Sequence, residues 1–450
     1  MDGRRLTRLK ILYVIHQFLP RYFTGTEQYA ASVALEAQRR GHEVQVFTLE
    51  PEADEGAGVK VWDDEVEGLA VRRVAMDPLS MPNPVAAEYD NPLLTRLLRR
   101  AIDEFQPDVV HVFHLRGIGA GGIWEARAAG VRTVVHLMDF WFFCPDFLLL
   151  RPDGELCDGP REGGLGCLDC INADLAGSLA VSEAHEAVRT AREAAGRSVR
   201  HEERLGSLYL AATGREEFCM QALAAADAIV APSGFMRETF EAQGVPADRL
   251  TQIPYGMDPD RLASLESAVK GKKKGSELVI GYVGSLVEHK GVHLLIEAFR
   301  RTRPGAVLRL HGRTDDYPQY VEDLLHLVDG DSRITFEGSF SRDQLGEVLS
   351  SIDLLVVPSI WYENNPLVMM EARAAGVPVA ASRLGGLVEQ VEVGTSGFLF
   401  DPTGYEELQT LLDGLVEDPS PLRAMNGPWP VRTLAQAFDA IEDLYESSAA

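Results

Sequence analysis

The sequence lacks any run of about 18 apolar residues that could cross a membrane, and no apolar signal region follows its first residues. It is poor in basic residues, with 43 Lys and Arg against 68 Asp and Glu, which gives a formal net charge of −25. Such an acidic chain is a poor nucleic-acid binder. We therefore expect a cytoplasmic protein with no nucleic-acid partner. Only five cysteines are present, and a reducing compartment argues against structural disulfides.

The first loop also lacks the glycine pattern of dinucleotide-binding enzymes. The apolar run Lys10–Phe18 predicts a strand, and in the loop after it only Gly25 is available where G-x-G-x-x-G would be needed. A nicotinamide-dependent enzyme is therefore disfavoured.

One basic cluster runs against the acidic balance, in residues 1–10. A solvated tail is one interpretation, and a weak contact with anionic lipid is the other. The second would place the protein peripherally at the inner face of the membrane.

What the sequence does contain is a repeated alternation of short apolar strands and amphipathic helices. A chain of 450 residues exceeds one ordinary core, so two domains are expected. The alternation predicts an α/β fold of two Rossmann-like, doubly wound parallel-sheet domains facing a central cleft. Ligands of such sheets bind at the carboxyl ends of the strands.

The domain boundaries follow from composition. Residues 1–264 form the first predicted Rossmann-like domain, with a Cys-rich loop and helical insert at about 144–220, and the C-terminal helix 428–450 completes it. Residues 276–427 form the second predicted Rossmann-like domain. The charged stretch between them predicts a linker whose lysines are solvated.

A helix start near residue 365 suggests an anion site. Asn365 is a plausible N-cap and Pro366 suits the first helical position. The N–H groups of Leu367 and Val368 would then point outward, and such a helix start binds phosphate.

Two glutamates flank that helix start with seven residues between them. Glu363 precedes it and Glu371 lies about one and a half turns inside, which is not the spacing of a capping box. Carboxylates accept hydrogen bonds from paired hydroxyls, so a sugar and a ribose are suitable ligands. Lys290 lies at a turn between a strand and a helix, where it could neutralise a diphosphate.

Several motifs together resemble the glycogen-synthase-like family of retaining, nucleotide-sugar-dependent glycosyltransferases (family 4), whose fold is GT-B. The resemblance covers nearly the whole chain. It is carried by FTGTEQ, PDVVHVFH, APSGFMRETF, IPYGMD, GYVGSLVEHKG, VPSIWYENNPLVMMEARAAGVPV and GTSGFLFDP.

The resemblance implies that residues 1–264 form the acceptor-side domain and residues 276–427 the nucleotide-sugar donor-binding domain, and it implies roles for matching residues. Glu371 would hold the ribose hydroxyls, Glu363 would contact the transferred sugar, and Lys290 would stabilise the leaving diphosphate without a metal ion. Gly25 would let the first loop approach the donor phosphates. Further donor-binding positions implied by the match are Ser285, Asn364, Asn365, Pro366, Leu367 and Val368.

The chain departs from the family pattern at Ser285, at Met138 and at Tyr255, the last standing where the family often has asparagine. Ser285 stands where the family often has arginine, so Arg313 is a candidate for the missing positive charge. Met138 precedes Asp139 where the family usually has histidine. His136 lies two residues earlier on the same face of that strand, either as a partial substitute or as a core histidine.

Together with Glu363 and Lys290, the catalytic candidates are therefore Asp139, His136 and His114, the last a separate cleft candidate.

Four cysteines form the spacing C-x12-C-x9-C-x2-C in a segment rich in Gly and Pro: Cys144, Cys157, Cys167 and Cys170. Such a segment cannot build its own core, and a structural zinc held by four thiolates would staple it. An iron–sulfur site and free thiols are the alternatives. Cys219, in helical sequence, is expected to be packing.

The sequence thus predicts a metal-independent hexosyltransferase-type glycosyltransferase, with UDP as the expected nucleotide and a glycan or lipid-linked glycan as acceptor, in polysaccharide biosynthesis. Two alternatives stay open. One is a phosphorylase-like or sugar-phosphate-forming enzyme of the same fold. The other is a non-catalytic assembly factor that binds nucleotide or glycan.

Overall fold

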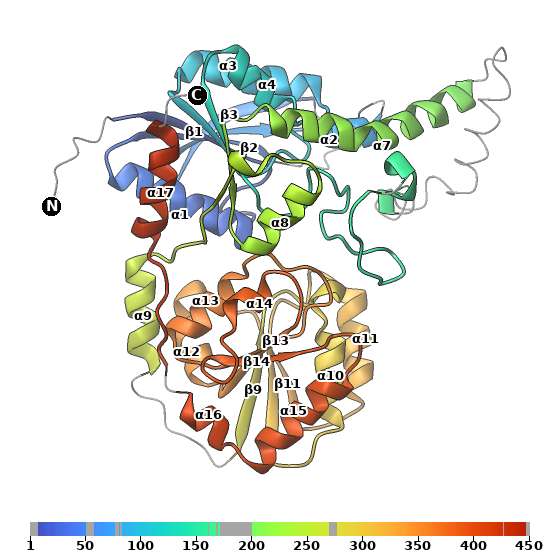
Figure 1. The fold of residues 1–450 in the computed structure, drawn as a ribbon, viewed down its shortest axis with the longest axis vertical. Coiled ribbons are helices and arrows are strands. Elements are labelled where there is room, and N and C mark those ends of the chain that lie inside the picture. Colours follow the sequence, from blue (N-terminus) through green and yellow to red (C-terminus); the bar gives the residue numbers. More distant parts are fainter. Residues whose placement is uncertain are drawn as a thin grey trace. The chain divides into compact units, whose positions relative to one another are not determined.

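We describe the fold from a computed structural model (Figure 1). The structure describes residues 8–50, 58–76, 81, 83–160, 162–167, 170, 171, 200–269, 277–425 and 427–446. The chain divides into two compact units. Unit 1 comprises Met1–Pro232, Met236–Ile253 and Phe438–Ala450, and unit 2 comprises Ser233–Phe235 and Pro254–Ala437.

Unit 1 is built on an eight-stranded sheet in the order β3-β4-β2-β1-β5-β6-β7-β8. Its strands are β1 (Lys10–Ile15), β2 (Glu43–Glu50), β3 (Lys60–Val66), β4 (Leu69–Ala75), β5 (Val109–Val112), β6 (Arg132–His136), β7 (Ala228–Ala231) and β8 (Leu250–Gln252). The paired strands are parallel except for the edge strand β3, which is antiparallel to β4.

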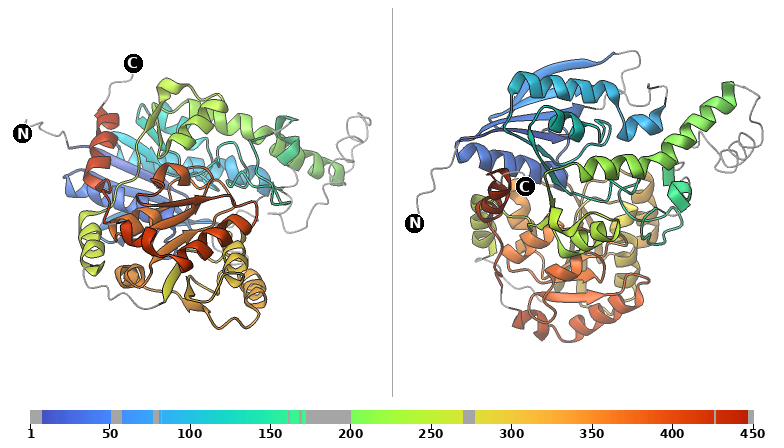
Figure 2. Two further views of the ribbon diagram at one scale, coloured as in Figure 1. Left: turned by 60° about the horizontal axis from the view of Figure 1, so that its bottom comes forward. Right: turned by 45° about the horizontal axis from the view of Figure 1, so that its top comes forward.

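The helices of unit 1 follow its strands in sequence. They are α1 (Gly25–Arg39), α2 (Pro84–Tyr89), α3 (Pro92–Phe105), α4 (Gly122–Ala128), the 3-10 helix η2 (Glu162–Cys167), α7 (Arg200–Ala224), α8 (Gly234–Ala242) and η3 (Ala247–Arg249). The start of α3 is set locally, because the Asn91 side chain accepts the Leu94 N–H at 3.2 Å and Pro92 occupies the first position. The amino-terminal part of α7 projects away from the sheet of unit 1 (Figures 1 and 2).

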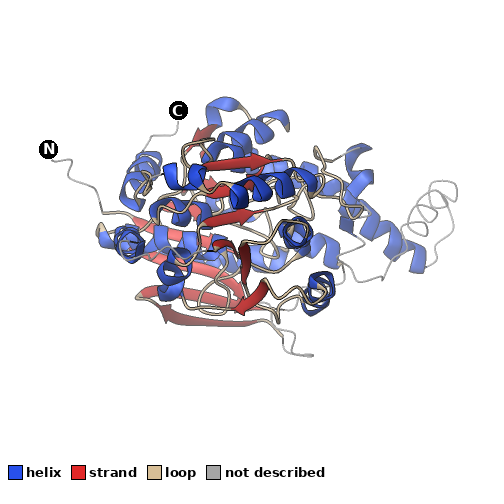
Figure 3. Cartoon of the chain, turned by 90° about the horizontal axis from the view of Figure 1, so that it is seen from below, coloured by secondary structure: helices blue, strands red, loops and turns tan. Residues whose placement is uncertain are grey.

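Unit 2 is built on a six-stranded parallel sheet in the order β11-β10-β9-β12-β13-β14. Its strands are β9 (Leu278–Val283), β10 (Ala306–His311), β11 (Ile334–Gly338), β12 (Leu354–Val357), β13 (Val379–Ser382) and β14 (Gly397–Phe400). Helices flank this sheet (Figure 3). They are α9 (Pro259–Val269), η4 (Glu288–Lys290), α10 (Val292–Arg300), α11 (Pro318–Val328), η5 (Arg342–Gln344), α12 (Leu345–Ser350), α13 (Leu367–Ala374), α14 (Leu387–Gln390), α15 (Glu406–Glu417) and α16 (Ser420–Ala424). The last helix, α17 (Leu434–Glu446), begins in unit 2, and its residues from Phe438 belong to unit 1.

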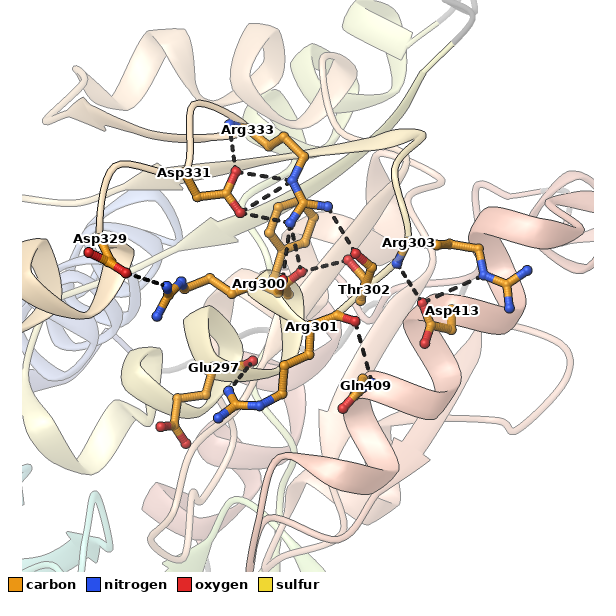
Figure 4. A network of polar contacts seen from close by, with 11 residues as sticks. Glu297, Arg300, Arg301, Thr302, Arg303, Asp329, Asp331, Arg333, Gln409 and Asp413 are labelled. Atoms are coloured by element: carbon orange, nitrogen blue, oxygen red, sulfur yellow. Dashed lines mark hydrogen bonds and ion pairs between the residues drawn. The ribbon is translucent and has the colours of Figure 1, made fainter.

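A network of polar contacts joins the end of α10 to the residues before β11 (Figure 4). The Arg333 guanidinium donates to the carbonyls of Arg300 (3.2 Å) and Thr302 (3.1 Å), and Asp331 holds it at 2.7 Å. These carbonyls end a helix and have no partner within it, so Arg333 satisfies them. The network lies near the amino-terminal ends of β10 and β11. The loops at the carboxyl-terminal ends of the strands lie on the opposite side of the sheet.

The α/β, doubly wound prediction is confirmed, with two differences in detail. The β3–β4 hairpin adds an antiparallel edge strand. The boundary between the units falls at residue 254 rather than within 264–276, because α9 packs against α12 and α13 and so belongs to unit 2. Residues 1–7, 172–199 and 270–276 lie outside the described residues, so the basic tail, most of the helical insert and the lysine-rich stretch are not described.

Within the described part of the chain, each helix is too short or too polar to span a membrane.

Candidate functional site

The order of the strands in unit 2 identifies a switch point at the carboxyl ends of two central strands. From β9 the chain moves outward through β10 and β11, and it then crosses back to β12 on the other side of β9. Between β9 and β12 the winding direction reverses, and ligands of such sheets bind in the crevice beyond the carboxyl ends at this switch point. The loops that leave these two strands carry Lys290 and Glu363.

The two loops are joined by backbone contacts. The Ile360 N–H donates to the His289 carbonyl at 3.0 Å. Gly291 has a φ of +68°, and a Cβ there would lie 1.9 Å from the Pro358 carbonyl oxygen. Only glycine fits this close approach, so the chain after Lys290 is fixed against the loop that leads to Glu363.

The carboxylate of Glu363 is buried and is held through one of its two oxygens. Its Oε1 accepts from Lys290 Nζ at 2.5 Å, Ser359 Oγ at 2.8 Å and Trp361 Nε1 at 3.0 Å. Among the described residues, no donor contacts Oε2 in this way. Lys290 Nζ also lies 5.1 Å from the centroid of the Trp361 ring. These three donors therefore all engage the same carboxylate oxygen.

The charge of Glu363 is maintained despite burial. Burial by itself would raise the pKa of this carboxyl, but the Lys290 ammonium and the Ser359 hydroxyl outweigh it and hold the pKa below its ordinary value. Glu363 is therefore ionised at neutral pH.

A pair of glycines supports the same loop from α14. The Gly386 N–H donates to the Glu363 carbonyl at 2.7 Å, and a Cβ on Gly386 would lie 1.7 Å from the Asn364 carbonyl oxygen. Gly385, at φ +50°, also lies close to the Glu363 backbone, because a Cβ there would lie 2.7 Å from the Glu363 carbonyl oxygen. Sequence reasoning missed this support. The consecutive glycines were a signal for a close backbone approach.

Helix α13, which follows Glu363 in the chain, starts one residue later than predicted. Pro366 has φ −62° and ψ 126° and is the N-cap, so α13 begins at Leu367, and the prediction of Asn365 as N-cap was wrong. The extended ψ of Pro366 accounts for the shift. Within the described chain, the N–H groups of Leu367 and Val368 donate to no backbone carbonyl. They remain suited to an anion at the switch point.

Glu371 is buried on α13 and pairs with Arg261 of α9. Burial raises the pKa of Glu371 above its ordinary value, and the opposing charges of Arg261 and Arg342 reduce that shift. Sequence reasoning missed Arg261, since a single arginine on a neighbouring helix carries no motif.

The two further donor-side candidates are placed differently. Ser285 is exposed in the loop after β9, and its carbonyl accepts the Tyr282 hydroxyl at 2.6 Å. Arg313 is also exposed, and it pairs with Asp315 at 3.2 Å and Asp316 at 3.4 Å. Its charge is therefore offset by its own loop.

Unit 1 has its own switch point, between β1 and β5. His16 follows β1, His114 follows β5 and Asp139 follows β6, so these side chains gather at one edge. His114 Nε2 lies 3.1 Å from Asp139 Oδ2, and His114 Nδ1 accepts the Arg116 N–H at 3.1 Å. An imidazole that accepts at Nδ1 carries its proton on Nε2, so His114 is the donor to Asp139.

His16 is the residue of this edge that sequence reasoning missed. Its ring centroid lies 4.2 Å from that of His114, and its Nε2 lies 4.0 Å from the buried Glu27. Burial, with His114 and Arg116 nearby, lowers the pKa of His16, so the ring is neutral. Its position directly after the first strand was the available signal.

Gly25 opens α1 as an exposed residue, and a Cβ there would meet nothing within 4 Å.

His136 lies in the core rather than at that edge. It is fully buried in β6, and its ring stacks on His111 at 5.7 Å and on Phe113 at 5.4 Å. Burial lowers the pKa of His136 to about 3. The position supports the core alternative and not a substitute for the residue at Met138, because the ring is enclosed by the rings of His111 and Phe113 with no exposed surface.

Three of the four cysteine thiols lie near one another. Burial, together with Cys144 and Cys157, raises the pKa of Cys167 to about 12, and burial raises that of Cys144 to about 12. The Cys157 thiol donates to the Gly159 carbonyl at 3.3 Å. The described residues include Cys170. Among them, no group of three or more His, Cys, Asp or Glu side chains is arranged to hold a metal ion. Binding of zinc or an iron–sulfur cluster stays a prediction, which elemental analysis of the purified protein tests. Cys219 is fully buried in α7, as expected.

Comparison with known proteins matches both units. Residues 24–163 match the family model of the glycosyl transferase 4-like domain, and residues 265–427 match that of the glycosyl transferases group 1. The D-inositol 3-phosphate glycosyltransferase of Stackebrandtia nassauensis is 30% identical over 219 residues, 45% of this chain and 49% of that protein. The glycogen synthase of Mycobacterium tuberculosis is 32% identical over 199 residues, 43% of this chain and 46% of that protein. The chain spans about half the length of the curated relatives it matches.

The fold is also that of solved structures, a glycosyltransferase of Rickettsia africae among them (TM-score 0.59, 14% identity over 98% of each chain). Alr3699/HepE of Anabaena, solved in complex with UDP, aligns with a TM-score of 0.59 and 18% identity over 97% of this chain and 95% of that chain. The same Anabaena protein has been solved with UDP-glucose. With both family models in place and the two parallel sheets of a GT-B fold, the chain belongs to the family 4 glycosyltransferases.

Proposed function

We propose that this protein is a retaining glycosyltransferase that moves a sugar from a nucleotide diphosphate sugar to a glycan or lipid-linked glycan, in polysaccharide biosynthesis. The observation that carries the proposal is the ion pair of Lys290 with the buried Glu363 at the switch point of unit 2, in which Lys290, Ser359 and Trp361 all donate to Glu363 Oε1. The proposed nucleotide is UDP, supported by the complexes of the Anabaena protein with UDP and UDP-glucose.

Each part of the donor has a residue suited to it. The Lys290 ammonium and the N–H groups of Leu367 and Val368 favour the diphosphate, because both carry positive charge. Glu371, inside the helix, would accept from the ribose hydroxyls. Glu363 Oε2 would accept from a hydroxyl of the transferred sugar, since Oε1 is already engaged.

The reaction forms the bond between sugar C1 and the acceptor oxygen and breaks the bond between C1 and the diphosphate oxygen. Negative charge develops on the leaving diphosphate, and the Lys290 ammonium neutralises it, so the proposal requires no metal ion. The acceptor attacks on the face from which the diphosphate leaves, which retains the configuration. Its proton passes to the leaving phosphate oxygen.

Unit 1 is the proposed acceptor side. Its switch point gathers His114 and Asp139, and a carboxylate that is fixed by the imidazole can orient a hydroxyl group through its remaining lone pairs. A peripheral place at the inner face of the membrane, and with it a lipid-linked acceptor, is the part of the proposal that rests on the basic residues 1–10.

The test combines binding and turnover. In a thermal-shift panel of UDP, GDP, ADP and dTDP, UDP at 100 times its dissociation constant should stabilise the protein by about 2.7 kcal/mol. UDP release from UDP-glucose should persist with a chelator present. Binding without turnover on any donor would replace the proposal with a non-catalytic role. Sugar phosphate formed from added inorganic phosphate would replace it with a phosphorylase-like activity.

A further inference from the structure

We propose that Arg215 of α7 is a positioning residue that fixes the His114–Asp139 pair of unit 1 through Trp141 and Glu88. The positioning itself is a property of the free protein. Its consequence for turnover rests on the proposed function, in which the pair serves the acceptor side.

Arg215 is buried and divides its guanidinium between two partners. Its Nε donates to Glu88 Oε2 at 3.0 Å, and its Nη2 donates to the Trp141 carbonyl at 2.7 Å. The guanidinium carbon lies 5.1 Å from the Trp141 ring centroid and 5.8 Å from that of Tyr89. Arginine alone among side chains can make two fixed donations while it stacks on aromatic rings.

From Trp141 the contacts lead directly to Asp139. The Trp141 backbone N–H donates to Asp139 Oδ1 at 2.9 Å, while Asp139 Oδ2 faces His114 Nε2 at 3.1 Å. The Trp141 indole N–H donates to Glu88, and its ring lies 5.3 Å from the His114 ring. Because both ends of Trp141 are tied to the Arg215–Glu88 pair, the orientation of the Asp139 carboxylate depends on that pair.

A second path reaches the other nitrogen of His114. The Arg116 side chain lies 3.6 Å from Glu88 Oε1, and the Arg116 backbone N–H donates to His114 Nδ1 at 3.1 Å. The imidazole is therefore held on both sides by groups that Glu88 anchors, and its proton is kept on Nε2.

Removal of the Arg215 guanidinium should affect both paths. Glu88 would keep its contacts to Trp141 and Arg116 but would lose the Arg215 guanidinium that fixes its Oε2, so its carboxylate could turn. The Trp141 carbonyl would lose its donor. His114 would then exchange between its two neutral tautomers. Since Arg215 of α7 falls within the insert predicted at about 144–220, this chain of contacts also connects the described part of that insert to the pair.

The experiment measures the side-chain nitrogen-15 signals of histidine in the full-length protein without ligand. A His114→Gln variant assigns the His114 signals among the 11 histidines. Wild type should give the pattern of a single Nε2–H tautomer, and Arg215→Met should give averaged shifts. Arg40→Met is the matched control, because Arg40 also pairs with carboxylates of unit 1, Glu36 and Glu442, and should leave the His114 signals unchanged.

Turnover of UDP-glucose provides the second readout. For Arg215→Met we expect kcat for UDP release to fall at least tenfold while KM changes less than twofold, because the donor residues lie in unit 2. If Arg215→Met fails to fold, Glu88→Gln, which keeps the side-chain size, carries the same two measurements. A folded variant with wild-type His114 signals would overturn the inference. Absence of turnover in wild type would count against the proposed function alone, since the tautomer measurement needs no donor.

Discussion

Replacement of Glu363 by glutamine should separate the two things that this side chain does. In the free protein, the Glu363 carboxylate neutralises Lys290 and accepts from Ser359 and Trp361 through one oxygen. The amide keeps the shape but removes the charge. Glu363→Gln should therefore destabilise unit 2, and it should also release Lys290 for another anion.

The magnitudes follow from those contacts. A hydrogen bond to a charged group contributes about 1.5–3 kcal/mol. A loss of about 2 kcal/mol corresponds to roughly 4–8 °C in Tm for a unit of this size. A diphosphate no longer has to displace the Glu363 carboxylate from Lys290, so UDP should bind more tightly, by up to about tenfold if 1.4 kcal/mol is recovered. Turnover should nevertheless fall by about 100-fold or more, because the contact to the sugar is weakened in the transition state.

The assay is calorimetric titration with UDP and UDP-glucose, beside thermal unfolding and UDP release. Glu322→Gln is the control, since Glu322 is an exposed carboxylate on α11 of the same unit, and it should change none of these quantities. UDP binding by Glu363→Gln that is weaker than in wild type would refute the reasoning. It would mean that Glu363 assists the nucleotide and does not compete with it for Lys290.

Three further predictions concern the same unit. Glu371→Ala should weaken UDP and UDP-glucose equally, by roughly 1.5–3 kcal/mol, and a loss confined to UDP-glucose would contradict the ribose assignment. Gly386→Ala should abolish UDP binding and lower Tm, because its Cβ would lie 1.7 Å from a carbonyl oxygen, whereas Gly414→Ala in α15 meets nothing within 4 Å and should raise Tm slightly. Unchanged UDP binding by a folded Gly386→Ala protein would show that this approach is not needed. The pKa of Glu363 is lowered on folding, so its contribution to stability is present above the unfolded value of about 4.3 and is lost as pH falls through the folded value. The difference in Tm between wild type and Glu363→Gln should therefore shrink as pH falls below about 4, and a difference that persists there would exclude the charge as its cause.

Local patterns in the sequence were sufficient to predict most of the fold. Apolar runs such as those of β1, β9 and β12, each followed by a helical pattern, predict parallel strands with crossover helices, because these periodicities are properties of neighbouring residues. The spacing of Glu363 and Glu371 and the position of Lys290 likewise sufficed to place a candidate donor site at one edge of one sheet.

The first residue of α13 could not be predicted from the sequence alone. Both Asn365 and Pro366 can cap a helix, and the choice depends on a backbone angle at Pro366 that packing sets. The role of His136 also stayed open in the sequence. Strand alternation places it on the same face as Met138, but it does not tell whether the side chain is buried in the core or reaches the carboxyl end of the sheet.

Only the tertiary structure decided which charges meet. Lys290 and Glu363 are 73 residues apart, Arg261 and Glu371 are 110 apart, and Glu88 and Arg215 are 127 apart. No periodicity connects such positions. They come together because parallel strands bring their carboxyl ends to one edge, and because a buried charge must find its partner wherever the packed helices place one.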